Sequence, residues 1–416
     1  MGGGGRNCIV YVSSPLRSSQ IIELLRGSVG RVVSEFVDAG VATSAGELAG
    51  MLDGCSVGVV VVATGGVEST LVEGLKRFKG LAGIVAHPYA NSTAALLEAY
   101  PLLAARGIPA VVLPSLEGGV VESRVGGLVR GLSAAARLRS SRLGVVGGPS
   151  PWLVYSRVDA EIVERRLGVK LVEIGLDELV EVYRHVDDSS LHGLAERVAA
   201  NAAYVDRGVD ELVRALKVYA ALKSIIGGRG LDAITVECFR VIERLDTTAC
   251  LAFSLLNSEG VVAGCEADVP STIAMMIASW ATGLPAFMAN VAGIDAGELV
   301  LAHCTAPLSL GEYRLLSHFE TGKGVGVSVK YPLSKATILR LDPGLERARV
   351  GVGEIVASGL LSPLRCRTQV KLRVGWDTGR LLEESMGNHV VLVPGFHLDE
   401  VRHALTALGI AYEVLA

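Results

Sequence analysis

The sequence is poor in aromatic residues and has no excess of positive charge. Aromatic side chains make up 5% of the 416 residues, and 39 Lys and Arg stand against 43 Asp and Glu, a net charge of −4. Without a basic excess we expect no nucleic-acid partner, because that binding relies on neutralising phosphates. Half of the residues are hydrophobic and 50 are glycine, which excludes a disordered chain and favours buried parallel strands over a lectin-like sandwich.

Local cysteine motifs are also absent. The seven cysteines are odd in number and no two have C-x-x-C spacing, so we expect reduced thiols in a cytoplasmic protein, not a disulfide scaffold or a zinc ribbon. The first residues hold no basic stretch followed by a long apolar run, so we expect no signal peptide.

One uncharged stretch, 269–294, is long enough to span a membrane. It is interrupted by Gly283-Leu284-Pro285. We therefore predict a buried helix over 271–281, a turn and a buried strand over 286–289, with no membrane partner.

The pattern of apolar runs predicts an α/β protein with three domains. Apolar runs alternate with helical segments, restart at Arg142, and give way after Leu299 to alternating apolar and polar residues. The first pattern is typical of parallel sheets covered by helices, and the second of antiparallel barrels. We predict two Rossmann-like parallel-sheet domains over 1–140 and 141–295, followed by a β-rich, barrel-like domain over 296–416. The main apolar runs are 8–13, 57–63, 81–86, 108–113, 143–146, 171–174 and 233–236, and the alternating ones are 324–330, 336–341, 347–357 and 367–374.

The glycine clusters do not match a nucleotide-binding motif. The run 144–148 departs from G-x-G-x-x-G, and the run 322–326 has no helix after it. We therefore expect no nucleotide cofactor. No G-x-S-x-G motif is present, which argues against a serine acyltransferase.

The densest polar cluster is Gly264-Cys265-Glu266-Ala267-Asp268, ahead of the uncharged stretch. Asp268 has the position of a helix cap, whereas a carboxylate as close to a buried segment as Glu266 needs a partner, a metal or a hydrogen-bond network. His303, His318 and His389 each stand at the boundary of an apolar run. With Glu266 they make a metal site that distant segments would have to assemble.

The same residues carry a resemblance to a known family. The chain resembles the L-fucose isomerase and L-arabinose isomerase superfamily in Asp232-Ala233-Ile234-Thr235, Gly264-Cys265-Glu266-Ala267-Asp268, Gly283-Leu284-Pro285-Ala286-Phe287-Met288-Ala289-Asn290, Ala302-His303-Cys304-Thr305-Ala306-Pro307 and Gly387-Asn388-His389. The resemblance implies two Rossmann-like domains and a β-rich domain. It also implies interconversion of aldoses and ketoses with a divalent metal, and assembly as a trimer or hexamer.

Carried over by motif, Glu266 is the first metal-binding carboxylate, Asn290 takes the place of the second, and His389 matches the histidine. The implied metal is Mn²⁺, with Mg²⁺ as an alternative. Asn290 is a departure, because an amide oxygen can bind a hard cation but cannot take up a proton at neutral pH.

The resemblance implies proton transfer between C1 and C2 of an open-chain sugar through a cis-enediol. Glu266 is the candidate base, and the second acid or base is Asp268, Glu320, a histidine or water. The candidate sugar-binding residues are His303, Ser317, His318 and Trp152, with His87 contributed by a neighbouring subunit. Two alternatives stay open: another metal-dependent enzyme acting on a modified or phosphorylated sugar, and a sugar-binding protein without catalysis.

Overall fold

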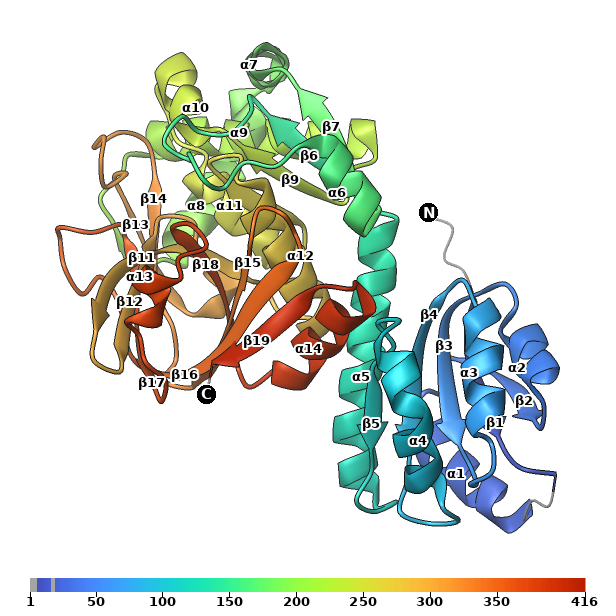
Figure 1. Cartoon of the computed structure of the whole chain (residues 1–416). Coiled ribbons are helices and arrows are strands. Elements are labelled where there is room, and N and C mark those ends of the chain that lie inside the picture. The colour runs from blue at the N-terminus through green and yellow to red at the C-terminus, as the bar shows by residue number, and fades with distance from the viewer. Residues whose placement is uncertain (1–5, 16–18, 416) are drawn as a thin grey trace. The chain divides into compact units, whose positions relative to one another are not determined.

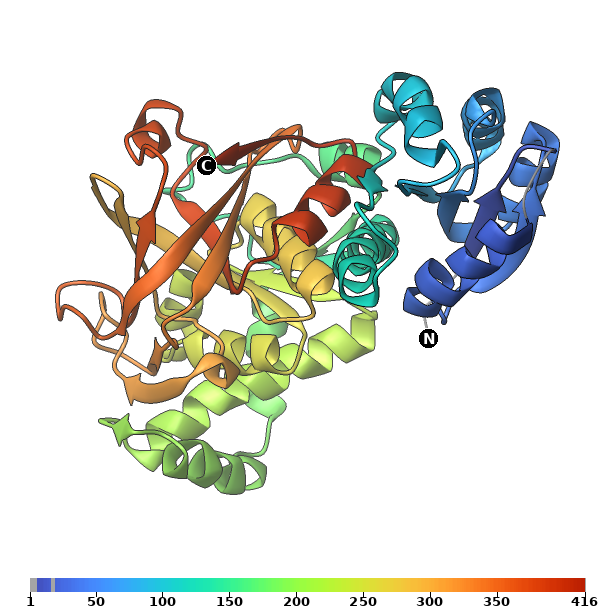
Figure 2. The same cartoon turned by 90° about the horizontal axis from the view of Figure 1, so that it is seen from below.

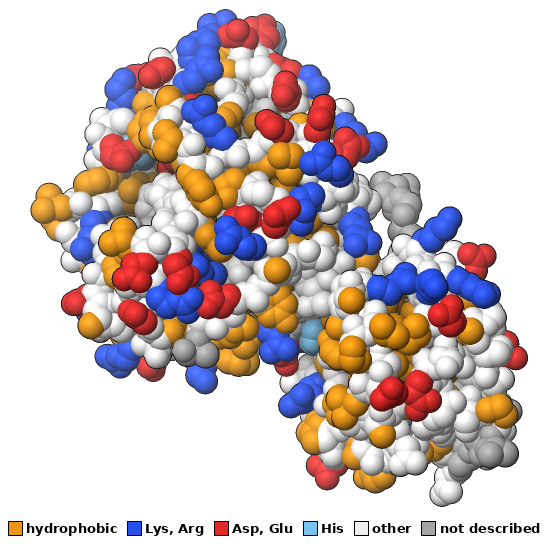
Figure 3. Space-filling view, in the orientation of Figure 1, with side chains coloured by type: hydrophobic (Ala, Val, Ile, Leu, Met, Phe, Trp, Pro, Cys, Tyr) orange, Lys and Arg blue, Asp and Glu red, His pale blue; other side chains and the backbone are white. Residues whose placement is uncertain are grey.

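The computed structural model describes residues 6–15 and 19–415. The chain forms two compact units: Met1–Arg137 with Asp399–Ala411, and Leu138–Leu398 with Tyr412–Ala416. The opening residues 1–5, where no signal peptide is expected, lie outside the described ranges. The predicted domain boundaries at 140 and 295 stay predictions. Lys and Arg side chains are interspersed with Asp and Glu on the visible face of each unit (Figure 3).

The first unit holds a parallel sheet of five strands in the order β2-β1-β3-β4-β5 (Figure 1). The central strands are continuous apolar runs such as VGVVVV, and they are buried because helices alternate with strands along the chain. The helix near the C-terminus belongs to this unit, where Arg130 pairs with Glu400 at 2.7 Å. The elements are β1 (Arg6–Val12), α1 (Ser19–Val32), β2 (Val37–Ala42), α2 (Ala45–Leu52), β3 (Cys55–Val62), α3 (Glu68–Arg77), β4 (Leu81–Ala86), α4 (Ser92–Ala104), β5 (Ala110–Val112), α5 (Gly118–Arg139) and α14 (Leu398–Ala407).

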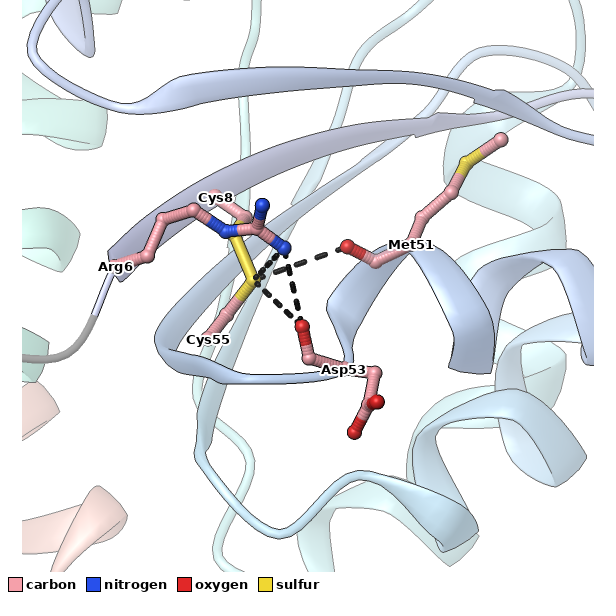
Figure 4. The surroundings of a disulfide bond; sticks show 5 residues. All are labelled: Arg6, Cys8, Met51, Asp53 and Cys55. Atoms are coloured by element: carbon pink, nitrogen blue, oxygen red, sulfur yellow. Dashed lines mark hydrogen bonds between the residues drawn. A yellow bond between two sulfur atoms is a disulfide. The ribbon is translucent and has the colours of Figure 1, made fainter.

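A disulfide joins Cys8 and Cys55 in this unit, so the expectation that all thiols are reduced is wrong for this pair (Figure 4). Strands β1 and β3 are neighbours, which brings the two Cα atoms to 6.1 Å although the residues are 47 apart in sequence. A rule based on local spacing does not detect such a pair. Arg6 covers it by donating from Nη2 to the carbonyl oxygen of Asp53 at 3.1 Å (Figure 4).

We expect Cys55→Ser to lower the unfolding free energy of the first unit by about 2–4 kcal/mol, because the disulfide closes a long loop in the unfolded chain. Urea unfolding of the variant and of the wild type, each with and without reductant, measures the change. Reductant is expected to destabilise only the wild type. Equal sensitivity of both proteins to reductant would contradict this role.

The second unit begins with a parallel sheet of four strands in the order β10-β9-β6-β7. The strands β6, β9 and β10 run in register, so the residues that follow them gather at one edge. Gly147, Glu237 and Glu266 stand directly after these three strands. The elements are β6 (Arg142–Val146), α6 (Ala160–Leu167), β7 (Lys170–Ile174), α7 (Leu176–His185), α8 (His192–Ala200), α9 (Val209–Arg229), β9 (Ala233–Val236), α10 (Cys238–Leu245), α11 (Cys250–Ser258), β10 (Val262–Cys265) and α12 (Val269–Thr282).

The chain then forms a closed antiparallel barrel, seen as the strands β11, β12 and β15–β18 in Figures 1 and 2. The order β15-β18-β11-β12-β17-β16 closes through pairing of β15 with β16. Alternate residues such as Phe287, Leu301 and Leu392 are buried in one shared core. The barrel strands are β11 (Phe287–Asp295), β12 (Glu298–His303), β15 (Lys335–Leu341), β16 (Arg347–Gly359), β17 (Thr368–Val374) and β18 (His389–Pro394); the smaller elements are β8 (Tyr204–Val205), β13 (Glu312–Leu316), β14 (Gly326–Lys330), α13 (Arg380–Glu383) and β19 (Ala411–Leu415), with short 3-10 turns at Asp188–Leu191 and Leu308–Leu310.

The predicted fold class, two parallel-sheet α/β regions followed by a β-barrel, is therefore confirmed. The uncharged stretch forms the helix α12, a turn and the strand β11, as predicted. Among the described residues, no helix combines the length and apolar character needed to cross a membrane.

Candidate metal centre

Glu266 stands at a sharp turn between β10 and α12. Its backbone and that of Ala267 are in the left-handed region, with φ of 60° and 50°, which is strained for residues other than glycine. Two hydrogen bonds hold the turn: Ser150 N–H donates to the carbonyl of Glu266, and Ala267 N–H donates to that of Val236, both at 3.0 Å. The Glu266 carboxylate is fixed in this way at the edge of the parallel sheet and is 6% exposed.

Two barrel histidines face this carboxylate. Oε1 of Glu266 lies 3.5 Å from Nε2 of His389 and 3.7 Å from Nε2 of His303. Each of the three residues offers a ligand atom within 4.8 Å of the other two. Metal–nitrogen and metal–oxygen bonds of about 2.0–2.2 Å fit a single ion among atoms at this spacing. The group can therefore hold a metal ion.

The barrel strand order brings the histidines together. His303 is the last residue of β12, and His389 is the first residue of β18. Strand β11 lies between these two strands, and its Asn290 pairs with Ala302 on one side and with His389 on the other. Because β12 and β18 both run antiparallel to β11, the end of β12 and the start of β18 lie beside the same part of β11, on its two sides.

Each histidine is oriented by a partner on its other ring nitrogen. Nδ1 of His389 lies 2.8 Å from Oδ2 of Asp268, and Nδ1 of His303 lies 3.1 Å from Oγ1 of Thr305. With the ring proton on Nδ1, each Nε2 can offer its lone pair to a cation held beside Glu266. Such outer partners fix the tautomer and raise the basicity of metal-binding histidines. The arrangement fits a metal centre.

The charges of the cluster agree with this geometry. Burial alone would raise the pKa of Glu266, but contacts with His303 and His389 hold it well below its usual range. Burial would lower the pKa of His389, yet the hydrogen bond to Asp268 and the nearness of Glu266 raise it to about 9. The carboxylate is thus anionic and the imidazole carries a proton that a bound cation would displace.

Asn290, predicted as the second oxygen ligand, is brought to the site. It lines the same cavity as Glu266 and His303. Its Oδ1 accepts a hydrogen bond from Nδ2 of Asn388 at 2.8 Å, and that Nδ2 also lies 3.4 Å from Nε2 of His389. Metal binding by Asn290 stays a prediction, and it would compete with the bond to Asn388.

A small cavity of about 30 Å³ lies beside the carboxylate. Glu266, Asn290, His303, His318 and Glu320 are among its lining residues, together with Phe239 and five cysteines. Burial and the charges of His303 and Arg367 lower the pKa of His318 to about 4. Burial and the negative charge of Glu266 raise the pKa of Glu320.

Trp152 closes the site on its solvent side. Its Nε1 donates to Oε2 of Glu266 at 2.7 Å, which leaves Oε1 for the histidines. Its ring meets Phe239 edge to face at 4.6 Å, and Phe239 meets His318 in the same way at 5.7 Å. Trp152 is nevertheless 47% exposed, so part of its ring is free to contact a ligand.

Other predicted site residues have different surroundings. Asp268 is fully buried and caps α12 by accepting from Ser271 N–H, so its observed contacts are structural and orienting. Both the carbonyl oxygen and Oγ of Ser317 accept from Arg367. His87 is buried at the end of β4 in the first unit and accepts from Tyr89 N–H. The roles predicted for these three residues stay predictions.

A larger hollow of about 690 Å³ lies at the ends of β6 and β7. Gly147, Gly148, Gly175 and Arg240 line it, and Ala267 and Val269 lie along one side. None of the three candidate metal ligands is among its lining residues.

Comparison with known proteins finds distant similarity to sugar isomerases. No family model matches the chain. It is 25% identical over 219 residues to sulfoquinovose isomerase of Priestia aryabhattai, covering 52% of this chain and 47% of that protein. It is 23% identical over 211 residues to the enzyme of the same name from Alkalicoccus urumqiensis (50% and 46%) and 26% over 234 residues to that of Clostridium sp. strain MSTE9 (52% and 48%). The chain spans about half the length of these curated relatives and is a distant relative of sugar isomerases.

Proposed function

We propose that the protein is a metal-dependent aldose–ketose isomerase acting on an open-chain sugar. The observation that carries this proposal is the convergence of Glu266, His303 and His389, with each histidine held through its other ring nitrogen. The distant similarity to sulfoquinovose isomerases supports the reaction class. Membership of the L-fucose and L-arabinose isomerase superfamily remains part of this proposal.

Glu266, His303 and His389 would hold the cation, with Asn290 as a further oxygen donor. When bound, the cation supplies Lewis-acid polarisation of the sugar carbonyl, which makes the neighbouring C–H more acidic. Two imidazoles and a carboxylate form a softer donor set than the two carboxylates and one histidine that the resemblance implies. This set favours Mn²⁺ over Mg²⁺.

The proton transfer itself falls to carboxyl groups of the cavity. Asp268 is committed to His389 and to the cap of α12, so it is the weaker candidate for moving protons. Glu320 lines the cavity, and its raised pKa brings its proton exchange closer to neutral pH. We assign proton transfer between C1 and C2 to Glu266 and Glu320.

The sugar would approach from the side of Trp152. The cavity of about 30 Å³ has room for an ion or a water molecule, not for a sugar. The exposed part of the Trp152 ring offers a flat apolar surface for the sugar, and His318 lies behind it across Phe239. Assembly as a trimer or hexamer, with His87 supplied by a neighbouring subunit, is a further part of the proposal.

An isomerase assay on metal-stripped protein tests the function. With Mn²⁺ restored, we expect ketose formation from at least one of sulfoquinovose, L-fucose, D-arabinose and L-arabinose, with Mg²⁺ less effective. Glu320→Gln is expected to lower kcat by about 10²–10⁴-fold while leaving Mn²⁺ binding intact. The matched control is Glu312→Gln, which changes an exposed glutamate of β13.

No turnover of any of these sugars would remove the isomerase proposal. The amide of Asn290 favours one alternative, another enediol reaction on a modified or phosphorylated sugar. With Asn290 in place of the second carboxylate, the site has one carboxylate fewer than the resemblance implies. Exchange of the C2 proton with solvent without ketose formation would support it. Saturable sugar binding with no exchange would instead support a non-catalytic sugar-binding protein.

A further inference from the structure

Five of the seven cysteines line the small cavity beside Glu266. They are free thiols that come from five separate segments of the second unit: Cys238, Cys250, Cys265, Cys304 and Cys366. The proposed isomerase reaction uses none of them. Such a concentration of sulfur next to a metal centre calls for a chemical role beyond packing.

A soft-metal site is one such role, but the sulfur positions do not support it. A thiolate metal site needs three or four protein ligand atoms around one ion, with sulfur among them. Within the described ranges, no three of these thiols offer sulfur atoms that all lie within 4.8 Å of one another; the group that meets this limit is Glu266, His303 and His389.

Two pairs of these thiols are in contact, Cys304 with Cys366 and Cys238 with Cys265, and the second pair directly adjoins Glu266. The sulfur atoms of Cys238 and Cys265 lie 3.0 Å apart. A disulfide bond is about 2.05 Å long, so the two atoms need to approach by about 1 Å. Cys265 ends β10 opposite Val236 of β9, and Cys238, two residues further along the chain than Val236, begins α10. Both side chains are almost completely buried, at 4% and 3% exposed.

We propose that Cys238 and Cys265 form a redox modification site at which a hydroperoxide makes a reversible disulfide and weakens metal binding. One thiol attacks a peroxide oxygen, the O–O bond breaks, and a sulfenic acid and one water form from hydrogen peroxide. The second thiol attacks the sulfenic sulfur, releasing a second water as the S–S bond forms. The two thiols lose two electrons and two protons, and the peroxide is reduced to two waters.

The position of Cys265 links this bond to the metal centre. Cys265 directly precedes Glu266, whose backbone lies in the strained left-handed region, and the carbonyl of Cys265 accepts from Asp268 N–H in the same turn. Drawing the Cys265 sulfur toward α10 shifts the chain at the residue that carries the central carboxylate. The disulfide itself does not depend on the proposed function; only its effect on the metal does.

The test oxidises the metal-free protein with hydrogen peroxide, alkylates the remaining thiols and maps disulfides by mass spectrometry. We expect a Cys238–Cys265 cross-link that dithiothreitol reverses. The Cys8–Cys55 disulfide, present before and after oxidation, serves as the internal reference. Calorimetric titration is expected to show Mn²⁺ affinity falling about 10-fold or more on oxidation and recovering on reduction.

Two variants separate this pair from its neighbours. Cys238→Ser is expected to lose both the cross-link and the peroxide effect on Mn²⁺, whereas Cys250→Ser, a buried thiol of the same cavity, keeps both. Wild-type mapping decides the matter even where a variant fails to fold. A Cys304–Cys366 cross-link or oxidation confined to Cys366 would overturn the proposal, as would an unchanged Mn²⁺ affinity of the cross-linked protein. If the protein forms the cross-link but binds no Mn²⁺ in either state, the proposed metal centre is wrong, and so is the proposed effect of the disulfide on it. The formation of the disulfide would still be supported.

Discussion

Glu266→Gln is expected to lower Mn²⁺ affinity by more than about 100-fold and to abolish isomerase activity, because loss of a direct ligand costs more than loss of an outer partner. The amide keeps the size of the side chain and one oxygen but carries no negative charge toward His303 and His389. Calorimetric titration of metal-free protein measures the affinity, and ketose formation measures the activity.

The matched control is Glu237→Gln. Glu237 directly follows β9 as Glu266 follows β10, and it is equally buried, but its carboxylate accepts from Ser150 Oγ and Arg240 N–H instead of facing the histidines. This variant is expected to keep Mn²⁺ binding even if it is less stable. Unchanged Mn²⁺ affinity in Glu266→Gln would show that the metal, if bound, is held elsewhere.

Asp268→Asn is expected to lower Mn²⁺ affinity about 10–100-fold, the usual range for an outer partner of a metal-binding histidine. Asp268 uses one oxygen for Ser271 N–H and the other for His389. Asparagine caps helices as well as aspartate does, but has only one oxygen for these two donors. The expected result is therefore weaker metal binding in a protein that still folds, measured by titration and thermal unfolding.

Ser271→Ala tests the hydroxyl contact of Asp268 separately. It removes the hydroxyl that donates to Asp268 at 2.9 Å but keeps the Ser271 N–H that Asp268 caps and the contact between Asp268 and His389. Its Mn²⁺ affinity is expected to stay near that of the wild type. Equal losses in the two variants would mean that the hydroxyl contact, not the bond to the histidine, controls metal binding.

Much of the fold could be predicted where the apolar residues form a clear pattern, and elements without such a pattern were missed. Strand β4 was predicted with its observed bounds because LAGIVA is continuously apolar and fully buried. Strand β2, with the sequence VDAGVA, was not predicted. It lies at the sheet edge and only its last residue, Ala42, is buried, so burial imposes no pattern on it. Strand β10 is fully buried, but with four residues it is too short to stand out as an apolar run.

For the candidate site, the sequence predicted which residues matter better than what each contacts. Glu266 stood out because a carboxylate bordered a segment that had to be buried, and the structure places it with His303 and His389. His303 was predicted in two roles, in a metal site by its position and as a sugar-binding residue beside the resemblance, because the pairing of β11 with both β12 and β18 is a long-range property that the sequence does not show. The contact between Asn388 and Asn290 gave no signal, since amide partners far apart in the sequence follow no spacing rule.

The strand order of the barrel keeps the two histidines together independently of the length of the loops between them. Its two histidines lie at the ends of strands that flank a common neighbour, while most of the intervening residues, including β13–β17, sit outside that three-strand contact. Insertions or deletions in the connecting loops can therefore lengthen or shorten the protein without moving either imidazole. A single added residue inside β18 would turn its side chains to the opposite face. Homologues of very different size can thus share one ion-binding core.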